Sequence, residues 1–138
     1  MIIAALQELE LYAVADRGIP NTERVPILVR EPTDIGQFGL MVGYSDTTGS
    51  AHPMRDNLFW FGNGLVNPGD WIIVYTGGGI QKTEDWHTPP GSKVYTVHWG
   101  RDRTMFTNGS IVPILFKVGA VHVDLPPSDL PQLGRANA

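Results

Sequence analysis

Residues 65–76 read LVNPGDWIIVYT, and this stretch decides the fold class. Pro68 and Gly69 occupy the second and third positions of a tight turn, which is the pattern of a type II turn. The run WIIVYT at residues 71–76 is apolar on both faces, and three glycines at residues 77–79 end it. A short apolar run between two turn signals predicts a strand in the centre of a hydrophobic core.

Alternating segments lie on both sides of this strand. Residues 7–15 (QELELYAVA) alternate apolar and polar side chains, as a half-buried strand does. Residues 23–30 (ERVPILVR) place Val25, Ile27 and Val29 on one face and Pro26 on the other. Because proline cannot donate a ladder hydrogen bond, we expect this strand to lie at a sheet edge or to start at a bulge.

The same reasoning divides the rest of the chain into short strands and turns. Residues 80–92 are polar and are expected to form a loop, and a hairpin about Gly119 is expected to close the domain. Further strands are predicted at residues 38–44, 57–61, 93–99, 111–118 and 120–124.

Composition supports one all-β domain. The chain has 138 residues, of which 16 are Gly and 11 are Pro, so these two types make up about a fifth, against a usual share of roughly 12%. No amphipathic helix of useful length is visible, and the class is an all-β sandwich or barrel. We expect one domain at residues 1–124 and a proline-containing tail at residues 125–138.

Charge and cysteine content exclude several classes of function. The net charge is −4 with no concentration of Lys and Arg, so binding to a nucleic-acid backbone is not expected. The chain has no cysteine, which rules out disulfides and thiolate metal sites. No apolar run approaches the roughly 20 residues of a membrane span. The expected location is cytoplasmic, and a secreted mature form stays open.

Catalytic patterns are missing from the sequence. No Gly-x-Ser-x-Gly elbow is present, and no nucleophile, base and orienting group can be assembled, so we expect no enzyme activity and no cofactor. Lys82 follows a glycine run, but Gln81 stands where a phosphate-binding loop needs glycine. Asp85, His87 and His98 are metal donors without the close spacing of a metal motif, so no metal site is predicted from them.

Aromatic residues carry the strongest indication of binding. Most of the aromatic side chains are expected in the core, and the remainder are expected to form an exposed docking surface together with the polar 81–92 loop. Aromatic anchors surrounded by polar groups are typical of protein interfaces. The interaction residues predicted from the sequence are Trp60, Trp86, His87, Lys82, Arg24 and Arg30.

The order of motifs resembles a known family. A Leu-Val-Asn-Pro-Gly-Asp turn leads into a strand that ends Val-Tyr-Thr-Gly at residues 74–77, and His-Trp-Gly-Arg follows at residues 98–101. Phe-Thr-Asn-Gly at residues 106–109 then precedes a strand that contains Ile-Val-Pro-Ile-Leu-Phe. This joint pattern, over roughly residues 6–124, is similar to the bacterial relatives of the lamin tail domain. The resemblance implies an immunoglobulin-like β-sandwich of about 7–9 strands.

The function expected from this reading is a non-enzymatic interaction module. The resemblance and the absence of catalytic patterns favour binding to another protein or self-assembly into a homo-oligomer, either through loops at one end or through an exposed sheet edge. A small carbohydrate- or metal-binding module that uses Asp85, Trp86 and His87 is the alternative, and a structural protein of a virus or phage is another.

Overall fold

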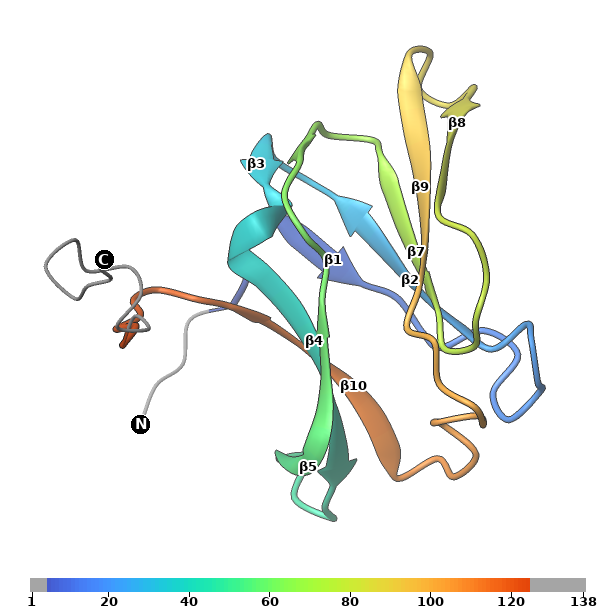
Figure 1. The fold of residues 1–138 in the computed structure, drawn as a ribbon, viewed down its shortest axis with the longest axis vertical. Coiled ribbons are helices and arrows are strands. Elements are labelled where there is room, and N and C mark those ends of the chain that lie inside the picture. The colour runs from blue at the N-terminus through green and yellow to red at the C-terminus, as the bar shows by residue number, and fades with distance from the viewer. Residues whose placement is uncertain (1–4, 125–138) are drawn as a thin grey trace, which may run out of the picture.

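The structure, a computed structural model, describes residues 5–124, and this part of the chain is an all-β sandwich (Figure 1). Five strands form the larger sheet in the order β1-β2-β7-β9-β8: β1 (Leu9–Leu11), β2 (Arg24–Val29), β7 (Trp71–Tyr75), β9 (Ser92–His98) and β8 (Lys82–Trp86). Three strands form the second sheet in the order β10-β4-β5: β10 (Ile111–Lys117), β4 (Phe38–Ser45) and β5 (Ala51–Trp60).

Two short elements complete the fold. β3 (Thr33–Asp34) pairs with β6 (Leu65–Val66), and a single 3₁₀ turn, η1 (Ile35–Gln37), leads into β4. The described residues therefore hold ten strands, slightly more than the 7–9 expected, because two of them are only two residues long. Among residues 5–124, no helix is both long and apolar enough to cross a membrane.

The hydrophobic core lies between the two sheets. Alternation along β2 and β7 sends every second side chain inward, where Val25, Ile27 and Ile72 are almost completely buried. β4 supplies Phe38 and Leu40 from the opposite sheet, also fully buried. The central position predicted for residues 71–76 is confirmed, since β7 lies between β2 and β9. The type II turn before it is also confirmed, with a φ of +93° at Gly69.

The prediction that residues 23–30 form an edge strand is wrong. β2 pairs with β1 on one side and with β7 on the other. The bulge alternative holds instead: between the pairs Leu11↔Ile27 and Ala15↔Arg24, one strand advances four residues (11 to 15) and the other three (27 to 24). On the β1 side, the Tyr12 N–H donates to the Pro26 carbonyl at 2.9 Å, and the regular pairing stops there, so the missing N–H of Pro26 falls at the start of the bulge.

Two other expectations are corrected. Residues 80–92 are not a continuous loop, because β8 forms within them and pairs in register with β9. All five β8 side chains are exposed, so no apolar alternation marks this strand in the sequence. The closing hairpin at residues 120–124 is also wrong: no strand forms beyond Lys117 in the described residues. The expected tail at residues 125–138 lies outside the described residues.

β5 is longer than its sequence pattern predicts. It begins at Ala51 and not at residue 57. Its pairing with β4 shifts between Met41↔Leu58 and Gly43↔Pro53, so two steps along β4 match five steps (58 to 53) along β5. Asp56, inside this bulge, has a φ of +62°. The extra residues interrupt the two-residue alternation of side chains along β5. The sequence pattern therefore did not predict the first half of this strand.

A buried carboxylate fastens three segments to one end of the sandwich. Glu23 is 1% exposed, and its oxygens accept hydrogen bonds from the backbone N–H groups of Gly18 (2.8 Å), Met105 (2.6 Å) and Phe106 (3.0 Å) and from the Thr76 hydroxyl (2.7 Å). Burial by itself would raise the pKa of this carboxyl, but the four hydrogen bonds outweigh burial and hold the pKa below its ordinary value.

Candidate binding groove on the outer sheet face

The outer face of the five-stranded sheet carries a groove of about 520 Å³. The strand residues that do not point into the core point here, and the register aligns Arg24 with Tyr75 and Pro26 with Ile73 across β2 and β7. β9 and β8 extend the same face. The groove is lined by Arg24, Pro26, Trp71, Ile73, Tyr75, Lys82, Glu84, Trp86, Val94 and Thr96.

Three aromatic rings, those of Trp71, Tyr75 and Trp86, line this groove, and each contacts a neighbouring side chain. The ring of Tyr12 meets Trp71 edge to face with 5.0 Å between centroids, and Tyr75 stacks on His98 at 5.4 Å. The Arg24 guanidinium lies over the Tyr75 ring, 5.9 Å from its centroid. Such contacts restrict ring motion, so the groove presents preorganised aromatic surfaces to a ligand.

Charged groups around the groove are paired with one another. Arg24 contacts Asp16 at 2.9 Å, and Lys82 lies 3.5 Å from Glu84. All four side chains are partly exposed, so their charges are screened and contribute little to stability. The floor of the groove is apolar, and the positive and negative charges at its rim offset each other. Such a groove suits a ligand that is uncharged, or that carries both signs of charge, better than a phosphate or another anion.

The hairpin that carries β8 has its own ion pair. Lys93 on β9 contacts Asp85 on β8, and its hydrogen bond and positive charge lower the pKa of Asp85, while the same contact raises the pKa of Lys93. The ring of His87, just after β8, lies against Trp86 with 4.8 Å between centroids. These contacts hold the end of the hairpin where β8 forms the edge of the sheet (Figure 1).

The structure brings together three of the six interaction residues predicted from the sequence. Arg24, Lys82 and Trp86 all line the outer-face groove, and His87 touches Trp86 at its end. Trp60 is 47% exposed but lies on β5 in the other sheet. Arg30 follows the end of β2 and contacts Glu10 at 2.7 Å, beside a different groove.

Sequence reasoning missed Trp71 and Tyr75 as surface residues. The run WIIVYT was interpreted as a core strand that is apolar on both faces, and neither ring was named among the predicted interaction residues. In the structure Ile72 and Val74 are buried, whereas Trp71 and Tyr75 alternate with them and are half-buried on the outer face. The signal was present in the polar tips of Trp and Tyr, which favour positions where one end of the ring reaches water.

The metal alternative finds no support in the described residues. Within residues 5–124, no three His, Cys, Asp or Glu side chains are grouped so that they could hold an ion. Asp85 is engaged by Lys93, and His98 stacks on Tyr75. Lys82 and Thr83 begin a strand, so no helix follows the glycine run to bind phosphate.

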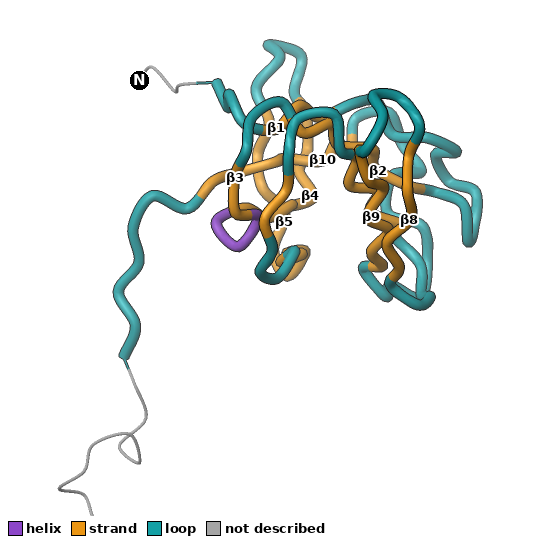
Figure 2. The backbone as a smooth tube through the Cα atoms, turned by 90° about the horizontal axis from the view of Figure 1, so that it is seen from above, coloured by secondary structure: helices purple, strands orange, loops and turns teal. Residues whose placement is uncertain are grey.

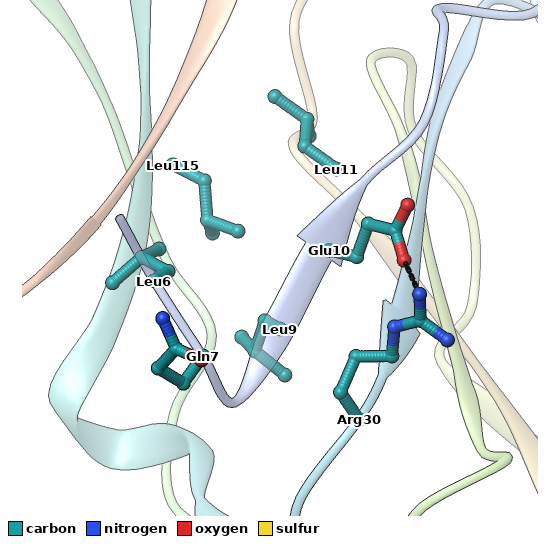
Figure 3. Close-up of a pocket in the computed structure, with 7 residues that line it drawn as sticks. All are labelled: Leu6, Gln7, Leu9, Glu10, Leu11, Arg30 and Leu115. Carbon is teal, nitrogen blue, oxygen red and sulfur yellow. Dashed lines mark ion pairs between the residues drawn. The ribbon is translucent and has the colours of Figure 1, made fainter. Parts of the chain in front are cut away.

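A second groove lies on the open side of the sandwich, between edge strands β1 and β10 (Figure 3). It also measures about 520 Å³, and leucine side chains form much of its wall. Glu10 and Arg30 pair at one rim. The groove is lined by Leu6, Gln7, Leu9, Glu10, Leu11, Arg30 and Leu115.

Three comparisons, with protein-family models, with curated proteins and with solved structures, found no match to this chain. The similarity to lamin tail domains therefore stays a prediction from the motifs in the sequence.

Proposed function

We propose that this protein is a non-enzymatic interaction module that binds an extended polypeptide segment at the β8 edge and in the outer-face groove beside it. One observation carries the proposal: a five-residue edge strand whose side chains are all exposed borders a sheet face on which Trp71, Tyr75 and Trp86 line one groove. A function in interaction is also what the resemblance to lamin tail domains implies.

Strand addition supplies the affinity in this mode of binding. An edge strand leaves a row of backbone N–H and C=O groups unpaired, and an added peptide pairs with them. β8 carries charged side chains, among them Lys82 and Glu84. Charges on an edge strand disfavour nonspecific pairing with the strands of other proteins, and they are common on natural edge strands. The aromatic rings then provide selectivity, since they can receive apolar side chains of the ligand.

Two tryptophan variants test the proposal. Random peptides displayed on phage are selected on the immobilised wild-type protein, and the enriched peptides are titrated against purified variants. Trp86→Ala should weaken binding by about tenfold or more, as loss of an aromatic anchor does. Trp60→Ala is the matched control, because it removes an exposed tryptophan from the other sheet, and it should leave the affinity unchanged.

The proposal is rejected by either of two outcomes: selection enriches no peptide, or the enriched peptides bind the Trp86→Ala variant as well as they bind the wild type. Circular dichroism of each variant establishes that the fold is intact, so a loss of affinity is attributable to the groove.

Oligosaccharide binding is the second candidate, and the open aromatic face favours it. Flat rings on a sheet surface can stack against the apolar faces of sugar rings, and Thr96 and Glu84 offer polar partners for hydroxyl groups. Calorimetric titration with neutral oligosaccharides separates the two candidates, because a heat of binding that Trp71→Ala abolishes would favour the sugar ligand.

A further inference from the structure

The chain leaves the sandwich after β10 as an extended arm, defined here as residues 119–124. The backbone N–H of Val118 still donates to Gln37 at 2.7 Å, and this bond continues the β10–β4 pairing by one residue. Every residue of the arm is exposed. Figure 2 shows this segment running away from both sheets.

The arm has the pattern of a strand without a partner. Val121 and Val123 alternate with Ala120, His122 and Asp124, so an extended backbone places both valines on one side. Val121 is 75% exposed and Val123 is 62% exposed. β-branched side chains in alternation favour a sheet in which one face is covered.

The arm is poorly placed to pair with its own sandwich. Val118 donates to Gln37, in the 3₁₀ turn just before β4, so the chain has already passed the end of the β4 strand when the arm begins. The chain does not reverse at Gly119, because no strand forms beyond Lys117 in the described residues and residues 119–124 are all exposed. A strand partner for the arm is therefore most easily found on another molecule.

The leucine-lined groove beside β1 has the matching features. β1 is three residues long, pairs with β2 on one side and forms the edge of its sheet. Leu6, Leu11 and Leu115 are only partly buried around the groove, so apolar surface remains open between the two sheets (Figure 3). At about 3.3 Å per residue, the five residues 120–124 are long enough to run the full length of the three-residue strand β1.

We propose that the arm of one copy adds as a strand beside β1 of a second copy, with Val121 and Val123 seated on the leucines of the groove. The added strand would extend the five-stranded sheet past β1 and close the open side of the sandwich. The polar face of the arm, with His122, would stay in water. This contact uses a different surface from the outer-face groove, so it is independent of the function proposed above.

The absence of cysteine from the chain permits a direct test by disulfide trapping. Leu11→Cys and Val121→Cys are prepared as separate variants, mixed and mildly oxidised. A disulfide-linked dimer that contains one chain of each kind, identified by intact mass, is expected to form in excess over the homodimers. The control replaces Leu11→Cys with Trp60→Cys, an exposed position on the other sheet that should not trap the arm.

Two outcomes would overturn the inference. One is a heterodimer yield no greater with Leu11→Cys than with Trp60→Cys. The other is a Leu11→Cys/Val121→Cys double variant that oxidises to an internally linked monomer, which would show that the arm folds back onto its own groove.

Light scattering supplies an independent readout. The Val121→Asp/Val123→Asp variant should self-associate about tenfold more weakly or worse than the wild type, whereas His122→Asp should retain the wild-type affinity. Both variants should keep the wild-type melting temperature when monomeric, because these residues lie outside the sandwich. A wild-type protein that is a strict monomer at high concentration would refute the proposal, and Trp86→Ala should leave self-association unchanged.

Discussion

Replacement of Glu23 with glutamine is the sharpest test of how the loops are held. The carboxylate accepts four hydrogen bonds, two at each oxygen. Glutamine keeps one acceptor oxygen and places an amide N–H₂ where the other oxygen was. If that group faces Thr76 and Met105, the threonine hydroxyl can rotate to accept, but the Met105 N–H is left without a partner.

The expected change in unfolding free energy follows from these four hydrogen bonds. Hydrogen bonds to a charged group contribute about 1.5–3 kcal/mol each, and an orphaned buried donor costs about 1–3 kcal/mol. Loss of the charge weakens the bonds that remain. We therefore expect Glu23→Gln to lower the free energy of unfolding by about 3–5 kcal/mol, a large share of the 5–15 kcal/mol typical of a domain.

Urea denaturation followed by tryptophan fluorescence measures this change. Glu31→Gln is the matched control, since Glu31 is exposed, and it should change the free energy of unfolding by no more than about 0.5 kcal/mol. A loss below about 1 kcal/mol in Glu23→Gln would refute the reasoning, because it would mean that the buried carboxylate does not hold the three segments together.

The same carboxylate predicts the direction of a pH effect. Its pKa in the folded protein is lower than in the unfolded chain, so its stabilising contribution is complete above the unfolded value of about 4.3 and declines as pH falls through the folded pKa. The difference in unfolding free energy between wild type and Glu23→Gln should therefore be largest near pH 7 and shrink in acid. A difference that stays constant down to pH 2 would contradict this assignment.

Three further variants probe other parts of the sandwich. Asp70→Asn should cost about 1–3 kcal/mol in urea denaturation, because Asp70 is 2% exposed and each of its oxygens accepts a backbone N–H. Gly39→Ala should cost about 1–3 kcal/mol, since an added Cβ would lie 2.7 Å from the Phe116 ring, whereas Gly109→Ala meets no atom within 4 Å and should melt like the wild type. Arg17→Met should increase amide hydrogen exchange in the 106–111 segment, since its guanidinium donates to three carbonyls there; unchanged exchange would exclude that role.

Local periodicity was enough to find most of the core. The alternation of Val25, Ile27 and Val29 predicted which side chains face inward, and the structure confirms this. The turn signal before residue 71 placed the start of β7 correctly. These features are visible in sequence because side-chain direction along a strand depends only on the neighbouring backbone.

The binding surfaces were only partly visible. Trp86, Lys82 and Arg24 were recognised as interaction residues, but they are distant in sequence, and only the pairing of β2, β7, β9 and β8 places them around one groove. β8 itself has no apolar face and is a strand because β9 lies beside it.

The chain's own pattern thus established an all-β domain, the inward faces of its main strands and several of its turns. Tertiary structure alone decided that Pro26 lies in an interior strand and that Trp71 and Tyr75 face outward. It also decided that no other residue within 5–124 covers the valines of the arm. The reason is physical: alternation identifies two faces of a strand, but which face is buried, and beside which neighbour, depends on contacts between residues far apart in the chain.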